Sequence, residues 1–249
     1  MTDRLGNELA GKHALVTGGA RGIGYAIALR LAAHGARVSI VSRSAPRLEP
    51  FFAAQADVTV EEAVTKAFEA ARNANGPIDI LVNNSGISDS APLARTSKTL
   101  FDRILATNLT GTFLCSRAVA QEMVIAKWGR ILNVASIAGL FGAPYISAYC
   151  ASKHGVIGFT RAIAAEFAGT GITVNALCPG YTETEMMTQA IEKITKHTGV
   201  TPEAAREALA EMNPEGRIAT VEEVAAAALD LILGDQNGVS LIIPGNAFA

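Results

Sequence analysis

Cysteine is scarce in this chain, which has three cysteines among 249 residues. Cys115, Cys150 and Cys178 have neither the spacing of a metal site nor the even number that would predict disulfides. We therefore expect no metal site and interpret all three residues as reduced thiols of a cytoplasmic protein. Cys150 is interpreted as a small packing residue, because free cysteine usually behaves as a buried hydrophobe.

An excess of one charge and long apolar runs are also missing. The formal net charge is −2, so the sequence predicts no general attraction to nucleic acid or to an anionic membrane. No apolar stretch is long enough to span a bilayer. Residues 1–12 include Asp3, Arg4 and Glu8 and lack the apolar centre of a signal peptide. These absences argue against nucleic-acid and membrane partners, so any recognition of phosphate must be local.

Apolar residues make up 49% of the chain, and no composition break divides it into two domains. Short runs rich in Ile, Val and Leu alternate with longer helical patterns. Such alternation predicts a single-domain α/β fold with a doubly wound parallel sheet. The predicted strands cover residues 14–17, 37–41, 78–82, 129–135 and 172–177.

Two segments depart from this alternation. Little or no helix is expected between residues 43 and 57, which include Pro46 and Pro50. Residues 183–215 are polar and helix-prone, with breaks at Gly199 and Pro202. We predict that this second segment is a helical lid inserted into the single domain.

Four glycines follow the first predicted strand in the run Thr17-Gly18-Gly19-Ala20-Arg21-Gly22-Ile23-Gly24, and a helix is predicted over residues 23–34. Glycine permits positive φ and lets the backbone approach a pyrophosphate, whose charge the free amides at a helix start can bind. A glycine-rich turn alone can be only a tight bend. Its place between the first strand and the first helix favours nucleotide binding.

Tyr149 and Lys153 are four residues apart and would meet on one face of a helix. Tyrosine titrates near pH 10, so a proton donor working near neutrality needs a downward pKa shift of about three units, or about 4 kcal/mol. A cation about 4 Å away, at an effective dielectric constant near 20, would supply about that much. We predict a phenol whose pKa the ammonium lowers, although this spacing alone is more often a solvated surface pair.

Several further motifs follow one another in the chain: Asp57-Val58, Asn83-Asn84-Ser85-Gly86, Asn108, Ser136, and Pro179-Gly180 followed by Thr184. With the glycine turn and the Tyr149/Lys153 pair, they resemble the short-chain dehydrogenase/reductase family over nearly the whole chain. The resemblance implies a Rossmann fold with a substrate lid, and an NAD(P)(H)-dependent oxidoreductase that interconverts a ketone and a secondary alcohol. Ser85 stands where the family usually has alanine, a small replacement that should leave the turn intact.

The resemblance implies catalytic roles for Asn108, Ser136, Tyr149 and Lys153. Ser136 would orient the carbonyl group, and Tyr149 would protonate the developing alkoxide. Lys153 would lower the pKa of Tyr149 and bind the nicotinamide ribose, while Asn108 would hold a helix bend and a water that leads to the lysine. The alternative from another class is a dinucleotide-sensing protein without catalysis, which would be expected to have lost Ser136, Tyr149 and Lys153, whereas this chain keeps all three.

The resemblance also implies a cofactor surface. Asp57 would lie near the adenine, the turn at residues 84–86 would lie beneath the cofactor, and Thr184 would contact the nicotinamide carboxamide. The predicted cofactor-binding residues are Gly18, Ala20, Arg21, Gly22, Ile23, Gly24, Ser42, Arg43, Asp57, Val58, Asn84, Ser85, Gly86, Tyr149, Lys153, Pro179, Gly180, Thr182 and Thr184.

The end of the second predicted strand favours NADP(H) over NAD(H). An NAD enzyme commonly has an acidic residue there, which binds the ribose hydroxyls and would repel a 2′-phosphate. This chain has Ser42-Arg43-Ser44 instead, and Arg43 together with Arg21 could pair with the phosphate. NAD(H) stays possible, because both arginines could be solvated surface cations.

The stretch after Pro179 is similar to the acyl-thioester ketoreductase branch of the family, so a 3-oxoacyl thioester or a related apolar or cyclic ketone is the expected substrate. Met186 and Met187 could line the lid or only pack within it. Lys193, Lys196 and His197 could bind a phosphate of coenzyme A or phosphopantetheine, or form a solvated face. The alternative enzyme is an NAD-dependent 3-hydroxybutyrate or polyol dehydrogenase.

Residues 99–125 and 149–167 resemble the two long helices through which this family pairs its subunits. Both segments are apolar on more than one face, and the second face must be buried somewhere. We therefore predict a homotetramer, or at least a dimer. The apolar residues are Leu105, Leu109, Phe113, Val119, Met123, Val156, Ile157, Phe159, Ile163 and Phe167.

Overall fold

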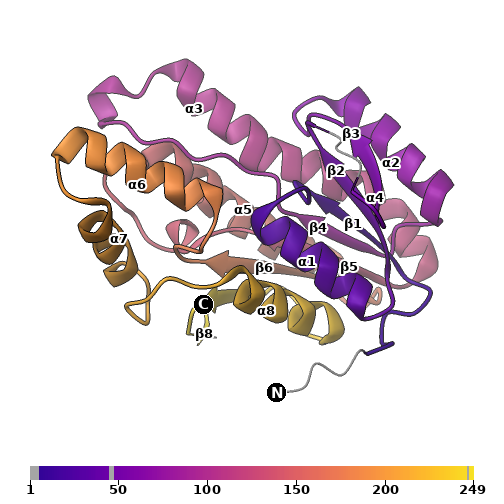
Figure 1. Cartoon of the computed structure of the whole chain (residues 1–249). Helices are drawn as coiled ribbons and strands as arrows, with labels where there is room; N and C mark the ends of the chain where they lie inside the picture. The colour runs from indigo at the N-terminus through magenta and orange to yellow at the C-terminus, as the bar shows by residue number, and fades with distance from the viewer. Residues whose placement is uncertain (1–5, 45–47, 246) are drawn as a thin grey trace.

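The predicted strands form the middle of one twisted sheet, whose strand order is β3-β2-β1-β4-β5-β6-β7-β8 (Figure 1). The computed structural model describes residues 6–44, 48–245 and 247–249. Within these residues, neighbouring strands from β3 to β7 are parallel, and β8 is antiparallel to β7. The strands are β1 (His13–Thr17), β2 (Arg37–Ser42), β3 (Phe52–Gln55), β4 (Ile80–Asn83), β5 (Gly129–Val134), β6 (Ile172–Pro179), β7 (Ser240–Ile243) and β8 (Ala247–Phe248).

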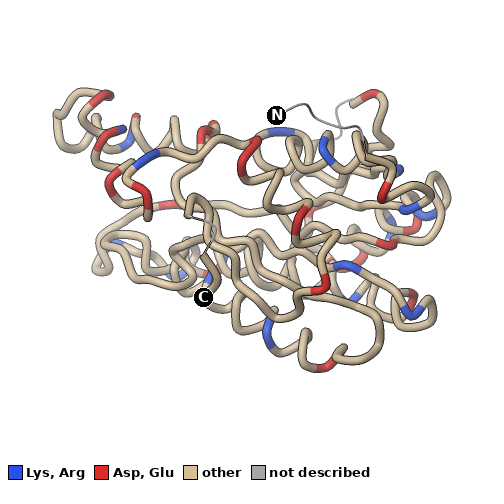
Figure 2. The backbone as a smooth tube through the Cα atoms, turned by 90° about the horizontal axis from the view of Figure 1, so that it is seen from below, with Lys and Arg blue, Asp and Glu red and all other residues tan. Residues whose placement is uncertain are grey.

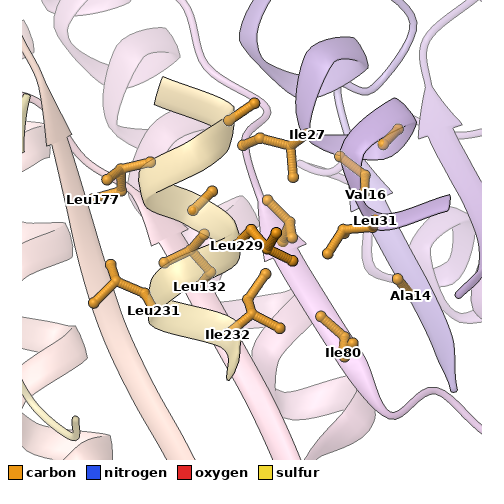
Figure 3. Close-up of a cluster of buried hydrophobic side chains, with 14 of the residues drawn as sticks. Ala14, Val16, Ile27, Leu31, Ile80, Leu132, Leu177, Leu229, Leu231 and Ile232 are labelled. Carbon is orange, nitrogen blue, oxygen red and sulfur yellow. The ribbon is translucent and has the colours of Figure 1, made fainter. Parts of the chain in front are cut away.

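Helices cover both faces of the sheet, as the doubly wound prediction requires. On one face, α1 and α8 pack against alternate strand residues such as Ala14, Val16 and Leu132 (Figure 3). On the other, α2, α4 and α5 pack against the intervening residues, such as Leu15 and Ile131. The helices are α1 (Gly22–Ala33), α2 (Glu61–Asn75), α3 (Lys98–Leu105), α4 (Gly111–Ala126), α5 (Ser147–Glu166), α6 (Glu185–Thr198), α7 (Pro202–Glu211) and α8 (Val221–Leu233).

The sheet and one helix differ from the sequence predictions. The sheet is not wholly parallel, because the chain turns back after β7 and adds β8 as a short antiparallel edge strand. The single helix expected over residues 99–125 is divided into α3 and α4 by a π-helical turn at Ala106–Thr110. Such turns often lie at functional sites, and this one contains Asn108.

The segment at residues 183–215 contains α6 and α7, as predicted. Gly199 ends α6 with a φ of 75°, a value that favours glycine. Pro202 begins α7, and Thr201 caps it by accepting a hydrogen bond from the amide of Ala204. Figure 1 shows these two helices apart from the helices that cover the sheet. Their role as a substrate lid stays a prediction.

The surface carries mixed charge. In Figure 2 the basic and acidic residues are interspersed along the backbone. In the described ranges, no helix is long and apolar enough to cross a membrane. Cys115, Cys150 and Cys178 are buried free thiols, and the described part of the chain brings together no group of three His, Cys, Asp or Glu residues suited to a metal.

Candidate active site

The predicted motifs converge at the carboxyl ends of four strands. The glycine turn follows β1, the turn at residues 84–86 follows β4, Ser136 follows the end of β5 by two residues, and Pro179 ends β6. The strand order reverses between β1 and β4. Ligands of doubly wound sheets bind in the crevice at such a point.

The glycine turn has a shape that side chains would obstruct. Gly18 and Gly22 have φ angles of 64° and 55°, which residues with a side chain rarely adopt. Asn84 Nδ2 donates hydrogen bonds to the carbonyls of Thr17 (3.1 Å) and Gly18 (3.0 Å) and so crosses the turn. A Cβ on Gly24 would lie 2.3 Å from that nitrogen. Glycine is therefore needed in this turn, both for its backbone conformation and for the close approach of Asn84.

The N-terminus of α1 is suited to bind an anion. Its N-cap, Arg21, makes no side-chain capping hydrogen bond, and its first turn contains no acidic residue. The first amides of a helix have no acceptor within the helix, so those of Gly22, Ile23 and Gly24 suit an external negative charge. Together with the half-exposed Ala20, these residues fit the pyrophosphate of a dinucleotide.

The turn after β4 brings Lys153 and Asn108 together. The amide of Ser85 donates to Thr17 Oγ1 at 3.1 Å, so serine in place of alanine leaves the turn intact. A Cβ on Gly86 would lie 3.4 Å from Asn108 Oδ1 and 3.6 Å from Lys153 Nζ. Both polar groups therefore face Gly86, where a residue larger than glycine would contact them.

Tyr149 and Lys153 lie on one face of α5, as their spacing predicted. Lys153 Nζ is 5.7 Å from the centroid of the Tyr149 ring. The lysine is 5% exposed, and its Nζ donates to the carbonyl of Val134 at 2.8 Å. The last residue of β5 therefore binds the ammonium of Lys153, two residues before Ser136.

Burial controls the protonation of both groups. It raises the pKa of Tyr149 to about 12, although the hydrogen bond with Ser136 lowers it, and it lowers the pKa of Lys153 to about 8. The predicted shift of Tyr149 toward neutrality is therefore wrong for this structure, because the surrounding protein disfavours the charged form of each group. The phenol is protonated at neutral pH, which is the form that a proton donor requires.

Ser136 and Asn108 complete the predicted catalytic set. Ser136 Oγ accepts a hydrogen bond from the amide of Ala138 at 3.1 Å, and Ser136 lies close enough to Tyr149 to lower the pKa of its phenol. Asn108 Nδ2 donates to the carbonyl of Ile87 and to Ser152 Oγ, both at 2.9 Å, and Asn108 Oδ1 accepts from the amide of Ile87 at 2.8 Å. Asn108 therefore holds the loop after β4 against α5.

Arg43 and Arg21 are exposed beside the glycine turn, but each has an acidic neighbour from another segment. Arg21 forms an ion pair with Glu185, the first residue of α6. The amide of Thr59 donates to Asp57 Oδ1 at 2.9 Å, and this hydrogen bond, with smaller help from the charge of Arg43, holds the pKa of Asp57 below its usual value. The sequence argument for two available arginines overlooked both acids, because neither lies at the end of β2.

Ser42 and Val58 differ in what they offer a cofactor. Ser42 ends β2, and its hydroxyl donates to the carbonyl of Ser44. Val58 is buried, and a Cβ on Gly111 would lie 2.7 Å from Val58 Cγ2. Since the side chain of Val58 packs against α4, a cofactor contact at this residue would be made by its backbone.

The turn after β6 faces the glycine turn. Thr184 caps α6 by accepting from the amide of Met187, and its Cγ2 lies 3.6 Å from the position of a Cβ on Gly22. Thr182 is buried, and its hydroxyl donates to the carbonyl of Gly180 at 3.1 Å. The structure therefore brings Thr184 beside Gly22 of the glycine turn, and its contact with the nicotinamide stays a prediction.

Sequence comparison identifies the family that this geometry suggests. Residues 12–195 match the family described as short chain dehydrogenase. The chain belongs to this family. The match spans the glycine turn, the catalytic set and most of α6.

Three relatives illustrate the similarity of this short-chain dehydrogenase to known proteins. The 3-oxoacyl-[acyl-carrier-protein] reductase MabA of Mycobacterium tuberculosis is 36% identical over 231 residues, which cover 92% of this chain and 89% of that protein. D-beta-hydroxybutyrate dehydrogenase of Cupriavidus necator is 38% identical over 235 residues, covering 90% and 91%. A crystal structure of an actinorhodin polyketide ketoreductase variant with NADPH has a TM-score of 0.88 and 33% identity, covering 96% and 98%.

The family and these relatives establish the reaction class. This short-chain dehydrogenase is an oxidoreductase that acts on CH–OH groups and interconverts a ketone and a secondary alcohol. Its cofactor is a nicotinamide dinucleotide.

Asn213 is a site residue that the sequence did not single out. Its Oδ1 accepts from the amide of Tyr181 at 2.7 Å, and its Nδ2 donates to the carbonyls of Tyr181 (2.8 Å) and Arg217 (2.6 Å). A Cβ on Gly180 would lie 2.2 Å from Asn213 Oδ1. Asn213 thus fixes the turn after β6 from the end of α7, over a separation that no local pattern indicates.

The basic residues of α6 differ in their surroundings. Lys196 and His197 are exposed. Lys193 matches neither sequence interpretation, because its Nζ donates to Asp89 Oδ1 and to the carbonyl of Ser90, both at 2.6 Å. The lysine is therefore engaged by the loop after β4.

Proposed function

We propose that this short-chain dehydrogenase uses NADPH to reduce a 3-oxoacyl thioester or a related apolar or cyclic ketone. The observation that carries the proposal is the placement of the Tyr149 ring 5.7 Å from Nζ of the buried Lys153, with Ser136 close enough to Tyr149 to lower the pKa of its phenol. In this arrangement, two hydroxyl groups can reach one substrate oxygen next to the glycine turn.

Each residue of the set has a distinct task in the proposed reduction. The nicotinamide supplies hydride when it is bound. Ser136 donates a hydrogen bond to the carbonyl oxygen, and Tyr149 transfers its phenolic proton to that oxygen as negative charge develops. Lys153 provides a positive charge behind Tyr149 and suits a contact with the cofactor ribose beside Gly86. Asn108 keeps the loop after β4 and α5 together around the lysine.

Apolar side chains near the catalytic set support an apolar substrate. Leu93, Phe141, Tyr145 and Met186 are exposed by 79%, 62%, 66% and 44%. The amide of Ala91 donates to the carbonyl of Tyr145 at 2.8 Å, so the loop that carries Leu93 lies beside the segment that leads to α5. Exposed apolar groups of this kind commonly mark a binding site, and they suit an acyl chain or a ring better than a small polar acid.

A panel of ketones, acyl thioesters and alcohols, each assayed with both nucleotides, tests this proposal. We expect the highest kcat/KM for a 3-oxoacyl thioester or an apolar cyclic ketone with NADPH. The similarity to D-beta-hydroxybutyrate dehydrogenase favours a second candidate, an NAD-dependent 3-hydroxybutyrate or polyol dehydrogenase. Faster oxidation of 3-hydroxybutyrate or a polyol with NAD than any ketone reduction would select that candidate.

The unmodified enzyme should have a lower KM for NADPH than for NADH, and Arg43→Asp should reverse the order. Loss of a charge-assisted contact to the 2′-phosphate, and repulsion from the new carboxylate, should weaken NADPH binding about tenfold or more. Fluorescence titration with each nucleotide measures both affinities. Lys98→Asp, an exposed charge reversal on α3, is the matched control and should leave them unchanged. Equal affinity for both nucleotides in the unmodified enzyme would contradict the two-arginine argument.

We also propose a homotetramer, or at least a dimer, that pairs α4 and α5 between subunits. The apolar residues predicted for this interface, which lie on α3, the π-helical turn, α4, α5 and the C-cap of α5, divide into a buried set and an incompletely buried set. The incompletely buried residues are Leu105, Leu109, Phe113, Phe159 and Ile163. Phe113 and Phe159 stack edge to face with ring centroids 6.2 Å apart, so an apolar surface spans both helices. Light scattering after size-exclusion chromatography should give a multiple of the 25.9 kDa chain mass, whereas an active monomer at micromolar concentration would contradict this proposal.

The proposed location is the cytoplasm. The buried free thiols of Cys115, Cys150 and Cys178 support it, because reducing compartments keep cysteines in this state. The proposed use of NADPH and a metabolic thioester points the same way.

A further inference from the structure

The loop between β4 and α3 is held by three other parts of the enzyme at successive residues. Ile87 exchanges two hydrogen bonds with Asn108 of the π-helical turn, through its amide (2.8 Å) and its carbonyl (2.9 Å). Asp89 and Ser90 bind Lys193 of α6. The amide of Ala91 binds the carbonyl of Tyr145, as described above. This loop therefore connects α6 with the segments that carry the catalytic residues.

The contact with α6 is stronger than an ordinary surface ion pair. Lys193 Nζ makes two hydrogen bonds of 2.6 Å, one to Asp89 Oδ1 and one to the backbone carbonyl of Ser90. The other carboxylate oxygen of Asp89 is 3.4 Å from Arg103 of α3. Both Lys193 and Asp89 have side chains that are less than half exposed. A pair with several charge-assisted contacts is held more firmly than a single exposed pair such as Lys98 with Asp102.

The charge state of Asp89 suits this contact. Partial burial disfavours the carboxylate, but the hydrogen bond from Lys193, the amide of Ser90 and the charge of Arg103 together hold the pKa of Asp89 below its usual value. The carboxylate is therefore ionised at neutral pH, and the pair with Lys193 is present under assay conditions.

The backbone of Tyr145, which the loop contacts through Ala91, is held in an uncommon conformation. Its φ is 68°, an uncommon value for a residue with a large side chain. Its ring is exposed beside the catalytic set, and it lies four residues before Tyr149. A shift of the loop that breaks the hydrogen bond between Ala91 and Tyr145 would free the backbone of Tyr145. It would also move the exposed side chains of Leu93 and Tyr145 relative to each other.

We propose that Lys193 and Asp89 form a latch that holds α6 against the loop after β4 and so sets the shape of the substrate entrance. This proposal rests on the proposed function. Lys193 and Asp89 are then positioning residues for substrate binding. They act through the loop, while proton transfer stays with Tyr149.

Hydrogen exchange followed by mass spectrometry tests the latch without any substrate. Lys193→Met and Asp89→Asn should each speed exchange in α6 about tenfold, because α6 would open without first breaking the charge-assisted contacts. Arg206→Met is the matched control. It removes the ion pair between Arg206 and Glu183, which lies within the lid segment, and should leave the exchange of α6 unchanged. Exchange of α6 in both latch variants equal to that of Arg206→Met would overturn the latch.

Kinetics test the positioning role. Each latch variant should raise the KM for the ketone about tenfold and change kcat by less than about twofold, since the contact positions bound substrate and not the proton. The double variant should be no worse than the single variants, because one contact is lost in each case. Lys193→Arg should recover most of the affinity.

The two tests separate failure of the latch from failure of the proposed function. If no ketone in the panel is reduced, the proposed function fails and the exchange result still decides the latch. Faster exchange with an unchanged KM would overturn the positioning role, and so would a fall in kcat at constant KM.

Discussion

Replacing Tyr149 by phenylalanine should lower kcat about 10²- to 10⁴-fold and leave the affinity for NADPH unchanged. The substitution removes one hydroxyl group, which is the proton donor in the proposed reduction, and keeps the ring beside Lys153. The pKa of Tyr149 is raised to about 12, so the phenol carries its proton throughout the usual assay range. Single-turnover kinetics and fluorescence titration measure the two quantities separately.

Tyr181 offers a matched control for this substitution. It is a second phenol near Tyr149, and burial also raises its pKa. Its backbone is fixed by Asn213, and its hydroxyl has no assigned task. Tyr181→Phe should therefore keep kcat within about threefold of the unmodified enzyme. Turnover by Tyr149→Phe at the rate of Tyr181→Phe would mean that another group donates the proton.

The sequence predicted the central strands because each is an apolar run buried on both faces. It missed β3, β7 and β8, which lie toward the edges of the sheet. Phe52, Ala53 and Ala54 of β3 are only half-buried, and β8 has two exposed residues. Short edge strands need fewer apolar residues than central ones, so the patterns of β3 and β8 are too weak to separate from a loop. β7 is buried throughout, and it was missed because its run is only four residues long.

The candidate site was predictable where its residues follow strand ends or share one helix face. Spacing alone placed Tyr149 and Lys153 together, and the resemblance to the family placed Ser136 beside them. Contacts between distant segments were not predictable. Lys193 and Asp89 are 104 residues apart, and the polarity of either residue is equally compatible with a solvated surface.

The pKa of Tyr149 was mispredicted for a related physical reason. The sequence argument considered one charge at a fixed distance and an intermediate dielectric constant. It could not include desolvation, which depends on how completely the rest of the chain encloses the two groups. In the folded protein, desolvation is the largest influence on the pKa of both Tyr149 and Lys153.

Lys153→Met should abolish most turnover and yet stabilise the protein without cofactor by about 3 kcal/mol at pH 7. The pKa of Lys153 falls from 10.5 to about 8 on folding, with burial as the largest cause. The folded state therefore binds this proton more weakly than the unfolded chain does. Methionine has a similar length and carries no charge, so it can fill the same space without the desolvation cost.

The lowered pKa of Lys153 determines how its cost in stability changes with pH. Between about pH 8 and pH 10.5 the unfolded chain holds a proton on Lys153 that the folded protein has released, so stability rises with pH in this window. The cost is fully present below about pH 8. Denaturant unfolding should show the variant about 3 kcal/mol more stable at pH 7, with the difference falling below about 1 kcal/mol near pH 10. Lys98→Met, which removes an exposed lysine from α3, should show no such pH-dependent gain.

A stability gain in an inactive variant would show that Lys153 is retained for its chemistry and not for the fold. Its Nζ donates a hydrogen bond to the carbonyl of Val134 at 2.8 Å and faces Gly86. The other N–H groups of the ammonium can then donate to a ribose hydroxyl. Bound cofactor should therefore stabilise the unmodified protein more than the variant, which reverses the order seen without cofactor. If Lys153→Met were instead less stable than the unmodified protein at pH 7 without cofactor, the ammonium would be well solvated inside the fold. The pKa of Lys153 would then lie nearer its usual value, and the pKa of Tyr149 would fall toward the value that the sequence predicted.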